Sequence, residues 1–420
     1  MIYVDNEISE LKKVITHVPN DGISRISPKK AESLLFDDIV FYPLMHEEYS
    51  IFQRILHAFI GPENVLDTTY LIAQAIEASP ESRETLIQQV LDFEELPQSF
   101  YRYLEELGAH DLSKVLITGY HRTEDRILFD PIPNYMFTRD IAVTIKDHIL
   151  ISKAAKEARH RENLLSQFIF NHHPIFSETT NDKKLIDLND LEAFPPSIRA
   201  EAVNAEGGDI MMFSPDHLLI GCSERTNAYA FESIKNKIFE LDLIDNVVQV
   251  NIPNERSFMH IDTLFTRIDH DTISCYKPIV YDGEGSNVVV YRKSGKRKIY
   301  PSIRAFVSAE ISKDINFVFS GDGLSPYQER EQWTDSCNLV ALRPGVAISY
   351  DRNLKTLNAF EKAGYRIMDS EEIFRQFYSD SNFIKNITKT IITIPSAELS
   401  RARGGSHCMT CPILRTPYSK

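Results

Sequence analysis

The sequence is poor in cysteine, and the few cysteines present do not suggest a framework. Only five occur among 420 residues: Cys222, Cys275, Cys337, Cys408 and Cys411. Their number is odd and their spacing is irregular, whereas disulfide-stapled domains carry even sets of cysteines in short chains. The sequence therefore predicts no disulfide framework, and we expect the thiols to be reduced.

Long apolar segments are also missing. No stretch approaches the roughly 18 apolar residues that a membrane-spanning helix needs. The chain starts with MIYVDNEISELKK, which carries acids where a secretory signal would carry an apolar core. These features predict a soluble, cytoplasmic protein without a membrane partner.

The chain has no excess of positive charge. It holds 46 lysines and arginines against 60 aspartates and glutamates, a formal net charge of −14. This charge would oppose an extended contact with nucleic acid phosphates and would attract a small cationic substrate. We therefore expect no nucleic acid partner. The length allows one large domain or two to three smaller ones.

What the sequence does contain is a repeated order of elements. Residues 209–251 predict an apolar strand, a turn, a second strand, a helix and a third strand. The same order recurs over 141–174 and 338–369, and it begins again at 260–276. Units of this kind arranged around an axis would bring one loop from each unit to a shared centre.

Residues 67–112 break this order. Their apolar residues recur at helical spacing, and Ser-Pro-Glu at 79–81 is typical of a helix start. The segment therefore predicts a small helical insertion that covers one side of the main fold.

Four short stretches collect polar groups where predicted strands end. They are NYMFTRD with Asp140, EGGDIMMF with Glu206 and Asp209, MHIDTLF with His260 and Asp262, and the terminal segment with Cys408. Because side chains two residues apart in a strand point to one face, we expect His260 and Asp262 to project together. Each stretch alone also fits an ordinary turn or a surface-facing alternation. One polar group per repeated unit is what a shared central site requires.

The cysteine pair in GGSHCMTCPI (404–413) allows three interpretations. A structural zinc site would need a second pair or distant histidines. A redox pair would open a helix, for which Pro412 and the short tail leave no room. The third interpretation makes Cys408 a nucleophile, with His407 beside the thiol and two glycines that let a ligand approach closely.

A metal site is the remaining alternative for the same residues. It would combine hard carboxylates with one soft thiolate, which is an unusual ligand set, so we expect no metal. Its ligands would be Glu206, His260, Asp262 and Cys408.

Taken together and in order, the motifs resemble those of the arginine deiminases in the guanidine-modifying (amidinotransferase) superfamily. They are VDNEISELKKVITHVP, LLFDDI, NYMFTRD, RHRE, EGGDIM, SERTN, MHIDT, REQWTDSCNLVALRPGVAISYDRN and RGGSHCMTCPI. The resemblance implies an α/β fold, a pseudo-fivefold α/β propeller of ββαβ units. In it, 1–420 form a single catalytic domain and 67–112 a small helical insertion. Two features depart from the family: Ile141 follows Asp140 where proline is usual, and the insertion is shorter than in typical bacterial members.

The resemblance also implies cysteine-dependent hydrolysis of free L-arginine to L-citrulline and ammonia through a covalent S-alkylthiouronium intermediate, with no cofactor and no metal. Carboxylates would accept the guanidinium donors, a thiolate would attack the central carbon, and a histidine with a pKa near neutrality would move protons. The implied catalytic residues are Cys408, His260, Glu206, Asp140 and Asp262. The implied substrate-binding residues are Asn134, Arg159, Arg225, Leu35 and, on a mobile loop, Arg403.

Other interpretations stay open from the sequence. Amidino transfer, or hydrolysis of agmatine or a methylated arginine, would use the same Cys408 and His260. A non-catalytic arginine-binding module would need no nucleophile. Each arginine could also form a surface salt bridge, and we expect Trp333 in the core. A homo-oligomer is compatible with all of these.

Overall fold

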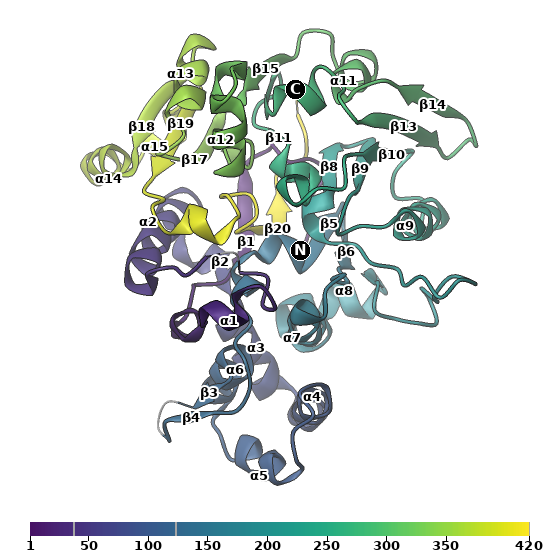
Figure 1. Cartoon of the computed structure of the whole chain (residues 1–420), viewed down its shortest axis with the longest axis vertical. Helices are drawn as coiled ribbons and strands as arrows, with labels where there is room; N and C mark the ends of the chain where they lie inside the picture. Colours follow the sequence, from purple (N-terminus) through teal and green to yellow (C-terminus); the bar gives the residue numbers. More distant parts are fainter. Residues whose placement is uncertain (37, 122–123, 420) are drawn as a thin grey trace.

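The repeated strands and helices fold into five sheets that lie around a common centre in this computed structural model (Figure 1). The structure describes residues 1–36, 38–121 and 124–419. Asp37, in the LLFDDI motif, lies outside these ranges. Each of the five sheets has three to five strands, and a short separate hairpin accompanies them within the described ranges.

Four of the sheets are built from strands between residues 142 and 394, and the fifth combines strands from both ends of the chain. The first contains β5 (Ala142–Ile145), β6 (His148–Ile151) and β7 (Leu185–Asp187). The second contains β8 (Ile210–Ser214), β9 (His217–Cys222), β10 (Asn246–Asn251), β13 (Asn287–Arg292) and β14 (Arg297–Tyr300). The third contains β11 (Phe265–Arg267), β12 (Thr272–Cys275) and β15 (Asn316–Phe319). The fourth contains β16 (Val340–Arg343), β17 (Val346–Tyr350), β18 (Arg366–Asp369) and β19 (Thr390–Ile394). The fifth contains β1 (Leu11–Thr16), β2 (Val65–Asp67) and β20 (Cys411–Arg415).

All five sheets share one plan. In each, an antiparallel pair of strands is extended by a parallel strand on one side, as in β8, β9 and β10. A parallel neighbour requires a crossover connection, which the helices α7 (His160–His172), α9 (Ala228–Glu240) and α13 (Leu354–Lys362) supply in three of the sheets. The predicted repeated unit is therefore present. In the fourth sheet β19 lies between β17 and β18, so the strand expected directly beside β17 is displaced to the edge.

The fifth sheet joins the two ends of the chain. β20 pairs antiparallel with β1, with Ile15 opposite Cys411 and Leu11 opposite Arg415. Figure 1 shows these two strands together in the middle of the molecule. The pairing brings the segment just before β1, which includes Glu7, close to the segment just before β20, which includes Cys408.

Four helices follow β2: α3 (Thr68–Ala78), α4 (Pro80–Phe93), α5 (Ser99–Glu105) and α6 (Ala109–Thr118). They form the lower part of Figure 1, and α3 and α4 pack against α7 of the first sheet. The Asp67 side chain accepts from the Thr69 backbone N–H and caps α3. Gly119, in the left-handed conformation, ends α6.

The MHIDTLF segment is not the strand that the alternation predicted. Residues Ile261–Thr263 form a short 3-10 turn, and β11 starts only at Phe265. His260, just before the turn, is still extended, so the two polar side chains leave the chain around a bend. The prediction failed because the backbone folds toward the centre here, where carboxylate side chains satisfy its N–H groups: Asp209 accepts from the Ile261 N–H.

No helix in the described ranges combines the length and the apolar character that a membrane span requires.

Candidate active site

Loops from several sheets meet around one pocket. Most of the predicted site residues line it: Leu35, Asn134, Asp140, Arg159, Arg225, His260, Arg403 and Cys408. The other two, Glu206 and Asp262, are completely buried behind the wall, where they contact His260 and Cys408 respectively. The structure therefore brings the whole predicted set together, although the residues come from distant parts of the sequence.

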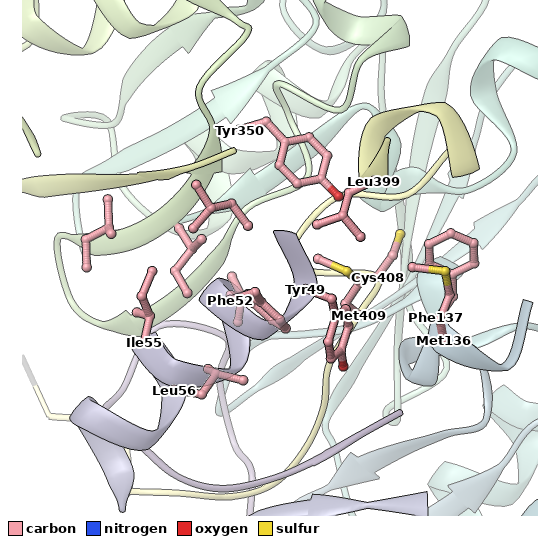
Figure 2. Close-up of a cluster of buried hydrophobic side chains, with 14 of the residues drawn as sticks. Tyr49, Phe52, Ile55, Leu56, Met136, Phe137, Tyr350, Leu399, Cys408 and Met409 are labelled. Atoms are coloured by element: carbon pink, nitrogen blue, oxygen red, sulfur yellow. The ribbon is translucent and has the colours of Figure 1, made fainter. Parts of the chain in front are cut away.

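Cys408 lies at the edge of a hydrophobic cluster. Figure 2 shows its side chain between Met409 and Tyr49 on one side and Met136 and Phe137 on the other. Much of the apolar wall comes from one face of α2 (Tyr42–Ile60), which buries Met45, Tyr49, Phe52, Ile55 and Leu56 at helical spacing.

The loop that carries Cys408 is tied to the same helix and to a neighbouring asparagine. The Glu48 carboxylate on α2 accepts from the backbone N–H groups of Glu398 and Leu399, at the start of the turn before the loop. The Cys408 N–H donates to the Asn338 side-chain oxygen at 3.0 Å. These contacts fix the nucleophile candidate through its backbone and leave its sulfur on the pocket wall.

The Cys408 thiol is protonated in the free protein. Its Sγ donates to Asp262 Oδ2 at 3.5 Å. Burial and then the nearby carboxylates of Asp262 and Asp140 raise the pKa of Cys408 well above that of a free thiol. A positive charge brought into the pocket would oppose these effects and favour the thiolate.

His260 is held by acids on several sides. Its Nε2 donates to Glu206 Oε2 at 2.9 Å, and its Nδ1 lies 3.9 Å from Asp140 Oδ1. Burial alone would lower the pKa of His260, but Asp140, Glu206 and Asp209 together raise it to about 10. The expectation of a pKa near neutrality is therefore wrong: the imidazole is cationic in the free protein, because it titrates among carboxylates rather than in water.

Arg159 joins the acids into one network. Its Nη1 donates to Asp140 Oδ2 at 2.8 Å and to Glu206 Oε2 at 3.1 Å, and its Nε donates to Glu162 at 2.8 Å. All four side chains are buried. Burial would raise the pKa of Glu206, but Arg159 and His260 hold it below its usual range, so the carboxylate is ionised.

The acids around His260 also have the spacing of metal ligands. Among the described residues, Asp140, Glu206 and His260 place one ligand atom each within 4.8 Å of one another. The guanidinium of Arg159 already bridges both carboxylates. The positive charge of Arg159 therefore balances these two carboxylates, and protein groups already satisfy the possible metal ligands.

Asp262 presents one oxygen without a partner. Oδ2 accepts from the Cys408 thiol and from His407 Nδ1, the latter at 2.9 Å. Oδ1 is buried and has no hydrogen-bond partner in the described part of the chain. A buried ionised oxygen is costly to leave unpaired, so this atom marks a position for a donor that the protein itself does not supply.

The pocket lining also includes Asn134, Leu35 and Arg225. The Asn134 side chain donates to the Leu34 carbonyl at 2.7 Å, which fixes it beside Leu35. Arg225 lies 3.6 Å from Glu206 through Nη1 and contacts the Met259 sulfur through Nη2. It is buried and more loosely paired than Arg159, so it can offer donors to an anion in the pocket.

Arg403, which lines the pocket, stacks on the ring of Trp333. The guanidinium carbon lies 3.2 Å from the centroid of the indole ring, and Nη1 donates to the Trp333 carbonyl. The prediction that Trp333 belongs to the core is wrong, because its side chain is 44% exposed. An aromatic face can hold a cation at the surface, and sequence alone does not distinguish that use from core packing.

Two glycines let side chains approach the backbone of this site. A Cβ on Gly208 would lie 2.5 Å from His260 Nδ1, and a Cβ on Gly404 would lie 2.3 Å from Phe137 Cε1. The EGGDI motif therefore has Gly208 where the His260 ring packs against the backbone, and the RGGSHC motif has Gly404 where the Phe137 ring does so.

Sequence reasoning missed several residues of the pocket. Phe137, Arg256, Met259, Thr263 and Ala402 also line it, and Asn338 holds the nucleophile loop. Most lie next to a predicted residue, so proximity in sequence was the only available signal. Asn338 is in the SCNLV stretch, which is far in sequence from every predicted site residue, so proximity could not reveal it.

Comparisons with known proteins agree with this site. Residues 104–415 match the family model described as arginine deiminase. The arginine deiminase of Limosilactobacillus fermentum is 32% identical, with 99% of this chain and 98% of that protein aligned. The arginine deiminase of Mycoplasma capricolum is 28% identical, with 99% and 97% aligned.

Solved structures show the same fold at lower identity. The N-terminal domain of ArgZ, a cyanobacterial arginine dihydrolase solved with its product, is 13% identical with a TM-score of 0.51, over 97% of this chain and 98% of that one. SxtG, an amidinotransferase of Microseira wollei, is 11% identical with a TM-score of 0.53, over 100% and 98%. The predicted fold class, the pseudo-fivefold α/β propeller, is confirmed. From its full-length similarity and its matched family model, the chain belongs to the arginine deiminase family.

Proposed function

We propose that this protein hydrolyses the guanidinium of free L-arginine to L-citrulline and ammonia, using only its own side chains. The observation that carries the proposal is the unpaired Asp262 Oδ1, a buried acceptor on the residue that also contacts the Cys408 thiol. A guanidinium offers N–H donors in a fixed planar fork, and a carboxylate is its natural acceptor. A guanidinium bound to Asp262 therefore lies against the sulfur.

The bound cation activates the nucleophile. In the free protein, burial and the carboxylates around Cys408 raise its pKa and keep it a thiol. A guanidinium between Asp262 and Asp140 neutralises those charges and lowers the cost of forming a thiolate. Cys408 releases its proton to solvent as the thiolate forms, and Sγ then attacks the guanidinium carbon, which gives a tetrahedral adduct.

His260 handles the protons on both sides of the covalent intermediate. As an imidazolium it donates a proton to the departing nitrogen, the carbon–nitrogen bond breaks, and ammonia leaves an S-alkylthiouronium on Cys408. The now neutral His260 takes a proton from water as the water oxygen attacks the same carbon. The carbon–sulfur bond breaks, citrulline leaves, and the thiol is restored. Glu206 orients the ring throughout through its 2.9 Å hydrogen bond.

The amino acid end of arginine calls for a second set of contacts. An α-carboxylate pairs well with a buried guanidinium, and Arg225 is a buried arginine of the pocket lining. Asn134 and Leu35 also line the pocket, and Arg159 keeps Asp140 and Glu206 in place while contributing positive charge. Arg403 lines the pocket from its stack on Trp333.

The chain offers a matched pair of thiols for the decisive test. Cys411 lies three residues after Cys408, is equally buried, and donates to the Ala142 carbonyl outside the pocket lining. We expect purified protein to release citrulline and ammonia in equal amounts from L-arginine. Cys408→Ala should abolish both, and Cys411→Ala should retain turnover.

Agmatine and methylated arginines should be assayed beside arginine. Turnover of one of these without arginine turnover would move the substrate and keep the mechanism. Activity retained in Cys408→Ala would overturn the nucleophile assignment. Arginine binding without any product would instead support a non-catalytic module.

We also propose that residues 1–420 act as one catalytic domain, with the helices of 67–112 as an insertion that buttresses α7. The reaction needs a reduced Cys408, which suits a cytoplasmic location. A homo-oligomer is compatible with this scheme, and light scattering on the purified protein would measure the assembly size.

A further inference from the structure

The VDNE segment at the start of the chain has no part in the mechanism above, yet its glutamate reaches the centre of the molecule. Glu7 is buried, and its Oε2 accepts from Arg139 Nη2 at 3.3 Å and from His407 Nε2 at 3.2 Å. The neighbouring Asn6 fixes the backbone around it, because its side-chain oxygen accepts from the N–H groups of Ile8 and Ser9. Glu7 lies outside the stretch that the family model matches and does not line the pocket.

His407 lies between two carboxylates. Its Nε2 contacts Glu7 and its Nδ1 contacts Asp262 Oδ2 at 2.9 Å. Burial would raise the pKa of Glu7, but Arg139 and His407 lower it to about 2, and His407 likewise holds the pKa of Asp262 below its usual range. Both acids are therefore ionised. An ionised carboxylate only accepts hydrogen bonds, so both ring nitrogens must donate and the imidazole carries two protons.

This protonation state decides which way Asp262 presents its oxygens. The doubly protonated ring engages Oδ2, the same atom that faces the Cys408 thiol, and leaves Oδ1 without a partner in the described chain. If the ring lost its Nδ1 proton, the bond to Oδ2 would become a contact between two acceptors. Asp262 would then be free to turn, and the guanidinium acceptor would lose its position.

We propose that Glu7 is a positioning residue for the reaction: by holding His407 doubly protonated, it keeps one oxygen of Asp262 against the Cys408 thiol and leaves the other, buried behind the pocket wall, without a protein partner and available to the guanidinium. The inference rests on the proposed function, since it assigns Glu7 a role in presenting Asp262 to a guanidinium. The other charged and titratable groups around this chain of contacts are Arg139 and Arg415 near Glu7, and His260 and Cys408 near Asp262.

The first test reads the protons directly and does not depend on activity. Neutron diffraction from crystals of the full chain at neutral pH would show whether His407 carries deuterium on both ring nitrogens. We expect both sites to be occupied. A singly protonated His407 would overturn the inference, whatever the substrate of the enzyme proves to be.

The second test uses Glu7→Gln in the full-length protein. The amide keeps the shape of the side chain but removes one of the two charges that hold the second proton on His407. We expect kcat/KM for arginine to fall about tenfold or more near neutral pH, as for the loss of one charge-assisted hydrogen bond. The fall in activity at alkaline pH should also begin at a lower pH than in wild type, because Glu7→Gln removes a negative charge beside the His407 ring.

A matched control separates this effect from a general loss of stability. Glu310 is a largely buried glutamate paired with Arg292 in the second sheet, outside the pocket lining. Glu310→Gln should leave the shape of the pH profile unchanged. A Glu7→Gln profile that is reduced equally at every pH would overturn the proposal, because a structural role lowers the amount of active enzyme without moving its pH dependence. If wild-type protein turned over no arginine, the proposed function would fail, and the neutron result would decide the inference on its own.

Discussion

At the scale of single residues, the site is a balance of buried charges in which Asp262 has a different partner from the other two acids. Asp140 and Glu206 are bound by Arg159, and Asp262 is bound by His407. Of these three acids, only Asp262 has an unpaired oxygen within the described part of the chain. The Asp262 carboxylate therefore has two proposed roles: it accepts hydrogen bonds from the substrate guanidinium, and its charge disfavours the thiolate form of Cys408.

Asp262→Asn should separate the two roles of this carboxylate. The amide loses the charge that accepts the guanidinium, so we expect kcat/KM to fall about 100-fold or more, the equivalent of two charge-assisted hydrogen bonds. The same change removes a negative charge that raises the pKa of Cys408. The thiol should therefore react with iodoacetamide at a lower pH than in wild type, as followed by mass spectrometry of the Cys408 peptide. Slower alkylation of the variant at all pH values would contradict the charge argument.

The residues with chemistry could be predicted from sequence because the short motifs that carry them, taken together and in order, resemble those of a known family. Cys408, His260 and the acids were found in this way, and the structure brings them together. Residues that work through geometry could not be predicted. Asn338 acts through a hydrogen bond to a backbone N–H, and Trp333 through the face of its ring. An asparagine or a tryptophan in a sequence does not say which atom it will offer.

At the scale of elements, the position of the nucleophile depends on a short loop between a turn and β20. Gly404 lies in that loop against the Phe137 ring, and Tyr350 donates its hydroxyl proton to the Gly404 carbonyl at 2.7 Å. The order of strands and helices was predictable because hydrophobic periodicity sets it. The bend at 261–263 was not, because a 3-10 turn held by Asp209 has the same alternation of polar and apolar residues as a strand.

Gly404→Ala tests how tightly this loop must pack. A methyl group 2.3 Å from the Phe137 ring forces the loop or the ring to move. We expect a loss of about 1 to 3 kcal/mol in the free energy of unfolding, as for overpacking elsewhere, and a lower kcat from a displaced Cys408. Gly108→Ala is the control, because nothing lies within 4 Å of the added atom there. The free energy of unfolding is measured by urea unfolding of each variant, and kcat is measured in a separate assay. Equal effects of the two substitutions on kcat would contradict the packing argument.

At the scale of the whole molecule, the two ends of the chain complete the fold and the site together. Pairing of β1 with β20 joins the two ends of the chain in one sheet, and Glu7 and His407, which lie just before these strands, are in contact. Because the centre of the molecule is polar, folding shifts the pKa of many buried groups, some upward and some downward. Stability must then depend on pH in a direction that these shifts determine.

The direction of this dependence differs from group to group. Glu7, with a pKa of about 2, gives stability that is present above the ordinary glutamate value and is lost as the pH falls toward 2. Burial raises the pKa of Asp209 to about 6 and that of Asp335 to about 7, so each destabilises the fold increasingly as the pH rises from the ordinary aspartate value toward these values. His260, raised to about 10, stabilises the fold fully below its ordinary value and loses that contribution as the pH rises toward 10.

Together these contributions place maximum stability on the acid side of neutrality, at roughly pH 4, because below it the contribution of Glu7 is lost and above it ionisation of Asp209 and Asp335 weakens the fold. Calorimetric scans from acid to alkaline pH should give the highest unfolding temperature there, with a fall on both sides. Asp335→Asn isolates one contribution, because the buried side chain has an unpaired oxygen within the described structure and the amide cannot ionise. The variant should be more stable than wild type above about pH 7, by on the order of 2 kcal/mol, and the gain should vanish at acid pH, below about pH 4. A constant difference at every pH would mean that the ionisation of Asp335 is not what weakens the fold, and that the decline toward alkaline pH must come from His260 and Asp209 instead.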